Sequence, residues 1–270
     1  MSNNIAVTGY SGFIGSNISS RFLGINLRYD SDFEKLKNCD VVIHLAGLAH
    51  RKYSEEELFN VNLDLTKRLV DKAILHNVKR FVYLSSINVL NESDNQTSTR
   101  SKRAAVEYLR EVSTLNKLEV VIVFAPLVYG PNAPGNFGLL TRLISNVRFL
   151  PFGSVYNQRN FISVQNLADL LQVCAINPDA AGHEFIASEG ESVSTKEFTN
   201  AIAKGLGKKV YQIPVPVPLM RVVGKLFRKT SMVELLVGNL QLDSSDLKNL
   251  LNWTPPYSME QSMIYLRPKN

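Results

Sequence analysis

Cysteine and histidine, the residues that cross-link small folds or bind metals, are scarce in this sequence. Its 270 residues include two cysteines, Cys39 and Cys174, which form no redox or ligand spacing. The four histidines show no metal-ligand spacing with Cys, Asp or Glu, so no metal site is predicted. His44 falls in an apolar stretch and is expected to be a satisfied core histidine. The few cysteines fit a reducing compartment.

Long hydrophobic runs and targeting signals are also missing. The longest uncharged apolar run, 120–130, is too short to span a bilayer, and the opening MSNNIAVTGY lacks the basic and apolar regions of a signal peptide. Counts of 15 Gly and 11 Pro are ordinary, which excludes collagen-like and low-complexity chains. We expect a cytoplasmic protein with no stable membrane insertion.

The excess of positive charge is small, with 30 Lys and Arg against 24 Asp and Glu, a formal net charge of +6. The densest basic cluster, Arg221–Lys229, is interrupted by apolar residues, whereas nucleic-acid binders more often show a dense basic stripe. No nucleic-acid partner is predicted. One face of this region carries Leu219, Val222, Val223, Leu226 and Phe227. Such a helix could lie on an anionic membrane surface, but we expect its apolar face to pack against the capping region.

Apolar residues make up 45% of the chain, which excludes disorder. In the first half, short apolar runs alternate with amphipathic segments, a pattern that implies parallel strands with crossover helices. The predicted strands are Asn4–Thr8, Asp40–Leu45, Phe81–Leu84 and Glu119–Phe124. The predicted helices are Phe13–Leu23, Leu63–His76 and Lys102–Thr114. The predicted fold class is α/β, a Rossmann-type doubly wound parallel sheet with a smaller interleaved substrate-capping region.

A glycine loop, residues 9–15, directly follows the first predicted strand and opens the first predicted helix. Gly9 permits the tight turn, Gly12 lets a pyrophosphate approach the backbone, and Gly15 allows helix and strand to touch. Free N–H groups and the positive end of the helix would hold the phosphate charge, so the loop predicts a bound dinucleotide. Its cofactor-binding residues are Gly9, Ser11, Gly12, Phe13, Ile14 and Gly15.

An acidic residue about 20 residues beyond such a loop binds the adenosine ribose. Asp30 fits this position and would repel a 2′-phosphate, which favours NAD; Asp32 is the alternative. Arg28 could pair with a 2′-phosphate, so NADP stays open as the cofactor. The segment between Asp30 and Asp40 is so short that one of the usual early strands is expected to be missing.

The pattern changes past Tyr129, where a loop rich in Gly and Pro precedes short elements. These are a helix at Gln165–Ile176, a strand at His183–Ala187, and helices opened by capping boxes at Ser194–Glu197 and Ser258–Gln261. We predict an NAD(P)-binding Rossmann domain at 1–130. Residues 131–270 form mainly the substrate-capping region, with segments near 160–190 returning to the Rossmann core.

Motifs along nearly the whole chain share the order and spacing of one known family. They are TGYSGFIG (8–15), HLAG (44–47), NLDLT (62–66), LSSINV (84–89), SKRAAVE (101–107), PLVYGP (126–131), GNF (135–137), RNFISV (159–164) and GNLQLD (238–243). With these motifs the sequence resembles the extended short-chain dehydrogenase/reductase family, specifically its nucleotide-sugar epimerases, dehydratases and reductases. The last two motifs resemble the branch that makes bacterial surface-polysaccharide precursors.

The resemblance implies a role for each matching residue. Ser86 matches the family's catalytic hydroxyl, and Lys102 matches the lysine that binds the nicotinamide ribose and lowers the pKa of a neighbouring tyrosine. The other implied cofactor-binding residues are Leu45, Ala46, Gly47, Asn62, Ser85, Pro126 and Leu127. The implied substrate-binding residues are Ser86, Asn88, Asn136, Phe137 and Arg159. The planar fork of an arginine can grip two phosphate oxygens of a nucleotide diphosphate.

One departure from the family pattern concerns the proton transfer. The family's Tyr-x-x-x-Lys motif reads Ser98-Thr-Arg-Ser-Lys102 here. A phenol has a pKa near 10 that an ammonium can lower toward neutrality, whereas an aliphatic hydroxyl is far less acidic, so Ser98 is a poor base by itself. Three interpretations stay open: a slow or non-catalytic protein, an altered residue at this position, or another proton donor. The candidate donors are Tyr129, Tyr83, Tyr156 and His50.

The resemblance implies an NAD(P)-dependent enzyme that acts on a UDP-sugar, either as a 4-epimerase or as a 4-keto-sugar reductase. The sequence does not choose between these reactions. The alternative is a dinucleotide or sugar-nucleotide binding protein without turnover, since Ser98 replaces the motif tyrosine. The helices predicted at 63–76 and 102–114 match those that commonly pair across a four-helix interface in this family, so a homodimer is expected.

Overall fold

The chain forms two compact units, each assembled from three segments. The structure, a computed structural model, describes residues 4–18, 22–27, 30–49 and 51–267, apart from the side chain of Asp30. Unit 1 consists of Met1–Pro126, Val164–Ala187 and Ser244–Pro255. Unit 2 consists of Leu127–Ser163, Ser188–Asp243 and Pro256–Asn270.

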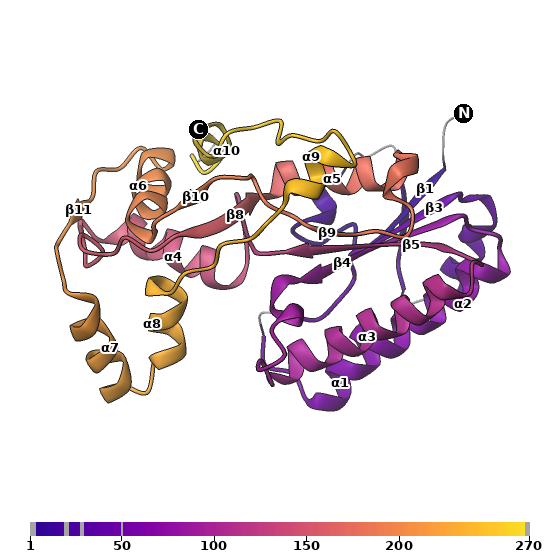
Figure 1. The fold of residues 1–270 in the computed structure, drawn as a ribbon, viewed down its shortest axis with the longest axis horizontal. Coiled ribbons are helices and arrows are strands. Elements are labelled where there is room, and N and C mark those ends of the chain that lie inside the picture. The colour runs from indigo at the N-terminus through magenta and orange to yellow at the C-terminus, as the bar shows by residue number, and fades with distance from the viewer. Residues whose placement is uncertain (1–3, 19–21, 28–29, 50, 268–270) are drawn as a thin grey trace. The chain divides into compact units, whose positions relative to one another are not determined.

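Unit 1 contains a six-stranded parallel sheet in the order β2-β1-β3-β4-β5-β9 (Figure 1). Its strands are β1 (Ile5–Thr8), β2 (Leu23–Ile25), β3 (Val41–His44), β4 (Arg80–Ser86), β5 (Glu119–Ala125) and β9 (Glu184–Ile186). The runs 41–43 and 120–125 are buried throughout, as expected of strands covered on both faces. Between β2 and β3 the described residues form only the 3-10 helix η2 (Asp30–Asn38), so the early strand expected to be missing is absent there. The Rossmann-type α/β prediction is confirmed.

Helices cover both faces of this sheet: α2 and α3 lie on one face, and α5 and α9 on the other (Figure 1). The α-helices of unit 1 are α1 (Glu55–Phe59), α2 (Leu65–Leu75), α3 (Thr97–Thr114), α5 (Val164–Ile176) and α9 (Ser245–Asn249). The π-helix η3 (Asn60–Asp64) joins α1 to α2, and 3-10 turns form η1 (Gly15–Asn17), η4 (Ile87–Leu90) and η5 (Pro178–Ala180). Helix α3 begins five residues earlier than predicted, because buried Thr99 and Ser101 satisfy their hydroxyls locally.

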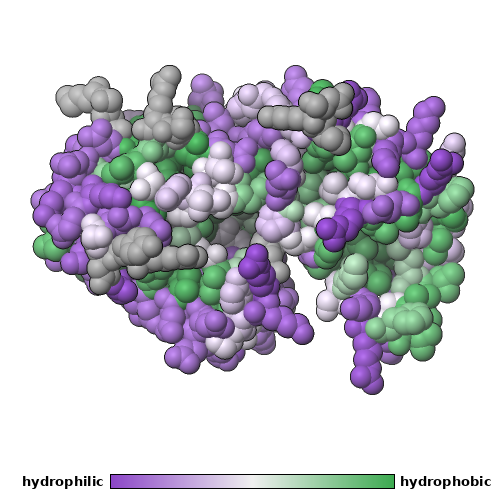
Figure 2. Space-filling view, turned by 180° about the vertical axis from the view of Figure 1, so that it is seen from behind, coloured by the Kyte–Doolittle hydropathy of each residue, from purple (hydrophilic) through white to green (hydrophobic). Residues whose placement is uncertain are grey.

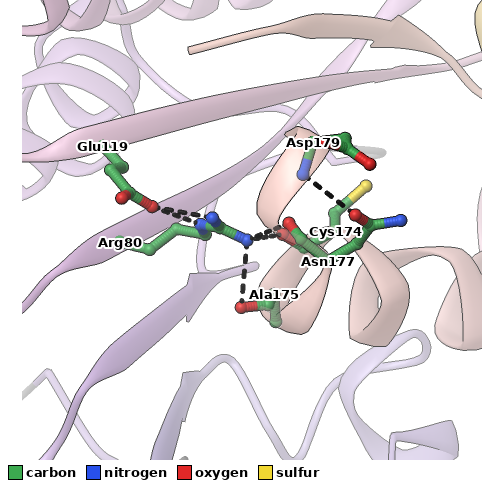
Figure 3. Close-up of polar contacts among 6 residues, drawn as sticks. All are labelled: Arg80, Glu119, Cys174, Ala175, Asn177 and Asp179. Atoms are coloured by element: carbon green, nitrogen blue, oxygen red, sulfur yellow. Dashed lines mark hydrogen bonds and ion pairs between the residues drawn. The ribbon is translucent and has the colours of Figure 1, made fainter. Parts of the chain in front are cut away.

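Arg80, buried at the start of β4, fastens the end of α5 to the sheet (Figure 3). Its Nη1 donates to the carbonyl oxygens of Cys174, Ala175 and Asn177 at 3.1, 3.4 and 2.5 Å, and its Nη2 lies 2.7 Å from a Glu119 carboxylate oxygen. The last carbonyls of a helix lack intrahelical partners and carry its negative dipole end, so a cation satisfies both. This contact holds the second chain segment of unit 1 on the sheet made by the first.

Unit 2 has a three-stranded sheet in the order β10-β8-β6 and a two-stranded sheet of β7 and β11. Its strands are β6 (Leu127–Tyr129), β7 (Phe149–Leu150), β8 (Arg159–Ser163), β10 (Ser192–Val193) and β11 (Tyr211–Gln212). Its helices are α4 (Gly135–Asn146), α6 (Thr195–Gly205), α7 (Val217–Leu226), α8 (Thr230–Val237) and α10 (Met259–Ile264). Aromatic rings form the core, with Phe161 and Phe198 stacked at 3.9 Å between centroids. The capping boxes predicted at Ser194 and Ser258 open α6 and α10.

Both cysteines are free and buried. Within the described ranges, no three His, Cys, Asp or Glu side chains lie close enough together to hold a metal ion. None of the helices in the described part of the chain combines the length and the apolar character needed to cross a bilayer.

Candidate active site

The carboxyl ends of β1, β3, β4 and β5 lie side by side at one edge of the unit 1 sheet. The strand register pairs Thr8 with His44, His44 with Tyr83, and Ser86 with Ala125. The sheet order reverses between β1 and β3, and open α/β sheets bind ligands beyond the carboxyl ends at such a reversal. The predicted residues that end or follow these strands are the glycine loop, Leu45, Ala46, Gly47, Ser85, Ser86 and Pro126. Leu127 opens unit 2.

The glycine loop turns sharply as it leaves β1. Gly9 has a φ of +68°, and a Cβ there would lie 2.8 Å from Ala46 N; a Cβ on Gly15 would lie 2.3 Å from Gly9 O. Both contacts are with backbone atoms, so the loop requires glycine at these positions. The N–H groups of Ser11 and Phe13 donate to no atom of the described residues. A loop with free donors beside this tight turn suits a pyrophosphate.

The helix predicted at Phe13–Leu23 is wrong. Among the described residues 13–18 and 22–23, the loop is followed by the single 3-10 turn η1 and no α-helix, and β2 begins at Leu23. The side chains of Ser16 and Asn17 donate back to Phe13 O at 3.2 and 2.9 Å, and such bonds compete with continued helix. A three-residue turn carries little dipole, so a phosphate bound here would depend on the loop's own N–H groups rather than on a helix end.

The two candidate ribose acids differ in what the structure describes. Asp30 begins η2, but its side chain lies outside the described residues, as does Arg28. The Asp32 carboxylate lies 2.7 Å from Lys35 Nζ and accepts the Asn26 N–H at 2.8 Å, and these contacts lower its pKa. Asp32 therefore has a structural task, and Asp30 stays the predicted ribose ligand.

A buried histidine links the ends of β1 and β3 to α2. His44 Nδ1 lies 2.6 Å from Thr8 Oγ1, and its Nε2 lies 3.0 Å from Thr66 Oγ1. Burial lowers the pKa of His44 to about 3, so the ring is neutral at physiological pH. Thr8 Oγ1 also accepts the N–H groups of Leu45 and Ala46 at 3.2 and 3.3 Å, so this network shapes the predicted cofactor trough. The prediction of a satisfied core histidine is confirmed.

Asn62 lies buried in the π-helical turn η3 at the centre of a second network. Its Oδ1 accepts the Leu48 N–H at 2.8 Å, and its Nδ2 donates to Ser101 Oγ at 2.9 Å and to Leu48 O at 3.3 Å. Ser101 Oγ in turn donates to Ser98 O at 3.2 Å. Single π-turns inside helices are frequent at functional sites. Here the turn lets Asn62 connect the segment after β3 to Ser101 in the N-terminal part of α3.

Lys102 and the serine that replaces the motif tyrosine share one face of α3. The helix begins at Thr97, so Ser98 and Lys102 stand one turn apart. Lys102 is half-buried and makes no hydrogen bond or ion pair within the described part of the chain. Desolvation lowers the pKa of its amine. An unpaired, partly desolvated ammonium is free to bind a ligand hydroxyl or to favour an anion beside it.

The two serines at the end of β4 differ in their environments. Ser85 is buried, and its Oγ finds no hydrogen-bond partner among the described residues. Ser86 is half-buried and its Oγ accepts the Asn88 N–H at 3.3 Å, which leaves its own hydrogen free to be donated. A buried hydroxyl without a partner costs about 1–3 kcal/mol, so the Ser85 hydroxyl is suited to a contact with a bound ligand.

The tyrosines predicted as substitute proton donors lack the environment of an acid/base. Tyr129 is fully buried in unit 2 and donates to Glu189 at 2.9 Å; burial and this carboxylate raise its pKa. Burial also raises the pKa of Tyr83 in β4. These shifts make deprotonation harder, which argues against the catalytic role predicted for Tyr129. Tyr156 is 74% exposed, and His50 lies outside the described residues.

The predicted substrate residues of unit 2 have unequal access to a ligand. Asn136 is exposed in the first turn of α4. The Phe137 ring is instead buried in the core, 5.9 Å from the Tyr129 ring, so the ring itself is not exposed for the substrate contact implied for it. Arg159, 8% exposed in β8, donates from Nη1 to Gly238 O at 2.7 Å, and burial lowers its pKa. Its other guanidinium donors remain for an anionic ligand.

Comparisons with known proteins agree with this arrangement. A profile of the NAD dependent epimerase/dehydratase family matches residues 20–187. The UDP-glucose 4-epimerase of Vibrio cholerae is 35% identical over 306 aligned residues, which cover 97% of this chain and 93% of that protein. The chain belongs to the NAD-dependent epimerase/dehydratase family.

Solved structures of this family type share the fold. The UDP-N-acetylglucosamine 4-epimerase of Bacillus cereus has a TM-score of 0.75 at 20% identity, with 98% of each chain covered. The UDP-glucuronic acid 4-epimerase of Bacillus cereus, in complex with NAD, has a TM-score of 0.74 at 17% identity, with 97% of this chain and 96% of that chain covered. At such identities the likeness concerns the fold alone.

The unit 1 residues of this family member fit NAD. The glycine loop, which tolerates no Cβ at Gly9 or Gly15, presents N–H donors that no other described residue accepts, and these suit the pyrophosphate. The Ser85 hydroxyl and the Lys102 amine, which have no partner among the described residues, are suited to the nicotinamide half. The shortened first helix does not prevent this fit, because every donor named belongs to the loop or to the strand ends.

The sequence predictions assign no role to three hydroxyl residues that support this family member's site, Thr8, Thr66 and Ser101, although the family motifs contain them. All three are fully buried and hydrogen-bonded. Spacing offers a signal for two of them: Thr66 lies one helical turn beyond Asn62, and Ser101 directly precedes Lys102. Nothing in the sequence shows that Thr8 faces a histidine on the neighbouring strand.

Proposed function

We propose that this protein is an NAD-dependent 4-epimerase of a UDP-sugar. The observation that carries the proposal is the shared sheet edge, where the glycine loop, the Ser85–Ser86 pair and the trough after β3 follow adjacent parallel strands. The Vibrio cholerae UDP-glucose 4-epimerase, similar over nearly the full length of both chains, favours epimerisation over reduction of a 4-keto sugar.

Each residue in this proposal has a task that its environment supports. NAD, when bound, supplies a nicotinamide that can take a hydride from C4 of the sugar and return it to the opposite face. Ser86 donates its free hydrogen to the C4 oxygen, and Lys102 holds the nicotinamide ribose. Arg159 and Asn136 bind the diphosphate. The C4 hydroxyl must lose its proton as the hydride leaves, and Ser98 is a weak base for it, so we expect slow turnover.

Product NMR tests the proposal directly. The protein is incubated with NAD and either UDP-glucose or UDP-N-acetylglucosamine, and in parallel with NADH and a UDP-4-keto-6-deoxy sugar. The expected result is slow appearance of the C4 epimer in the first set. Reduction of the keto sugar alone would replace epimerase by reductase. No new sugar in any reaction at high protein concentration would overturn the enzymatic function.

The second candidate is a protein that binds NAD and a UDP-sugar without turnover, and Ser98 is the observation that favours it. This candidate predicts NAD binding by calorimetry with no product in the NMR experiment. It also predicts that Ser98→Tyr restores nothing. Restored turnover in that variant would show a catalytic scaffold that lacks only its proton donor.

We further propose a homodimer formed through α2 and α3, in the cytoplasm. An open groove of about 370 Å³ between these helices is lined by Asp71, Ile74, Tyr108, Glu111, Val112, Leu115 and Lys117. Leu75 and Leu115, which are 65% and 60% exposed, add apolar surface that a second copy would cover. Sedimentation equilibrium should return twice the chain mass of 30.2 kDa. A monomer mass would refute the dimer, and cell fractionation tests the location.

A further inference from the structure

Helices α7 and α8 form a hairpin that projects from the rest of unit 2 (Figure 1). The two helices touch at Gly224, where a Cβ would lie 2.5 Å from a Val233 methyl group. Arg221 donates to the Glu234 carboxylate at 2.8 and 3.2 Å, and the Lys229 N–H donates to Gly224 O at 2.7 Å. The hairpin therefore holds its shape through its own contacts.

The apolar side chains of the hairpin face solvent, so the predicted packing of this face against the capping region is wrong. Those at least 45% exposed are Leu219, Val222, Val223, Leu226, Phe227, Met232 and Leu235. In α7 they recur at the i, i+3, i+4, i+7 spacing of one continuous helix stripe. Helix α8 packs beside Gly224 and leaves this stripe uncovered. Figure 2 shows apolar surface at the hairpin, lower right, with hydrophilic side chains at its end.

Basic residues border this apolar stripe. The segment 217–237 contains four basic residues and one acidic residue, Glu234, which is already paired with Arg221. Lys225, Arg228 and Lys229 make no ion pair within the residues that the structure describes. A soluble anion would satisfy these cations but leave the apolar stripe in water, and a neutral bilayer would do the reverse. A surface that offers acyl chains and anionic head groups together satisfies both.

We propose that the α7–α8 hairpin docks the protein on the surface of an anionic phospholipid bilayer. The apolar stripe enters the boundary between head groups and acyl chains, and the basic side chains contact the lipid phosphates. With ten residues, α7 lies along the surface and does not cross it. This inference is independent of the proposed epimerase activity.

Vesicle co-sedimentation of the full chain tests the proposal. One set of vesicles contains phosphatidylcholine alone, and the other contains phosphatidylglycerol in phosphatidylcholine. We expect binding to the second set, weakened by added salt because exposed charges are screened. Leu226→Asp with Phe227→Asp should lower the partition coefficient at least tenfold. Lys225→Gln and Arg228→Gln should each lower it about fivefold.

Leu139→Asp is the matched control, since Leu139 is 60% exposed in α4 of the same unit. It should bind vesicles as the unchanged protein does, and circular dichroism should show all variants folded. No binding of the unchanged protein to anionic vesicles would overturn the proposal, as would equal binding to both sets. Self-association without vesicle binding, lost in the Leu226→Asp, Phe227→Asp variant, would assign the stripe to a second copy and also overturn it.

Discussion

The two sides of the predicted cofactor site in unit 1 are built in different ways. On the glycine-loop side the described residues between β1 and the three-residue strand β2 form a tight loop and a single 3-10 turn, and the proposed binding would depend on backbone shape and on N–H groups that have no partner among those residues. On the lysine side, an eighteen-residue helix, a π-turn and buried hydroxyls form a connected side-chain network. The comparison teaches that the loop keeps its tight backbone shape without an α-helix in the described residues that follow it. The lysine side retains its scaffold but lacks the phenol that the scaffold would position.

The largest expected effect comes from restoring that phenol. Ser98→Tyr places the acidic hydroxyl one turn before Lys102, and we expect turnover to rise about 10²-fold, within the range of general acid–base catalysis. Initial epimerisation rates measure it. Glu107→Tyr, an exposed position farther along α3, should leave the rate unchanged. If Ser98→Tyr binds NAD normally and turns over no faster, the lysine side is not an incomplete catalytic site.

On the loop side, Gly9→Ala should weaken NAD binding at least tenfold. The Cβ meets backbone atoms after β3, whereas at Gly182, with φ +75°, a Cβ meets nothing within 4 Å. Both alanines bear the left-handed backbone strain of roughly 1–2 kcal/mol, so Gly182→Ala isolates strain from close approach. Calorimetric titration with NAD and thermal melts measure the pair. Equal NAD affinities in the two variants would show that the loop's close approach does not matter.

A change inside the lysine-side network should have a smaller effect, which we expect in the free energy of unfolding. Asn62→Leu removes the partner of the Leu48 N–H and of Ser101, and unpaired buried groups of this kind cost about 1–3 kcal/mol. Urea unfolding measures the loss, and Asn95→Leu, an exposed asparagine of unit 1, is the control. Identical urea unfolding midpoints for the two variants would show that the hydrogen bonds of Asn62 do not stabilise the fold.

The smallest effect near neutral pH should come from His44. Its pKa of about 3 in the folded chain lies below the ordinary 6.5, so the unfolded chain takes up the proton first. This stabilising contribution is complete above pH 6.5 and is lost as pH falls toward 3, by about 1.4 kcal/mol per pH unit. His44→Gln should flatten the unfolding free energy over that window, and His183→Gln, a change at an exposed histidine, is the matched control. If the free energy of unfolding changes with pH in the same way in both variants, the His44 ring is not held neutral by burial.

Much of unit 1 could be predicted from the sequence, because buried parallel strands such as Val41–His44 are nearly continuous apolar runs. The helix predicted after the glycine loop is not formed by the described residues 13–18, where the side chains of Ser16 and Asn17 bond to Phe13 O instead. The serine at 98 is visible in the sequence, but the orphaned Ser85 hydroxyl is not, since only the folded chain shows what surrounds it. For the same reason, periodicity reveals the Leu219–Leu226 stripe but not whether anything covers it.

The interleaving of the two units constrains the order in which the chain can complete its fold during synthesis. When residue 126 has left the ribosome, β5 still lacks β9, and Arg80 has no carbonyls of α5 to contact. Trp253, which donates to Asp169 at 2.8 Å, is made only after the second segment of unit 2. A nascent chain that ends at residue 163 therefore has an unpaired edge at β5, and its Arg80 guanidinium lacks the α5 carbonyl groups that accept its hydrogen bonds. Unit 1 can complete its fold only after most of unit 2 has left the ribosome, because its last segment is Ser244–Pro255.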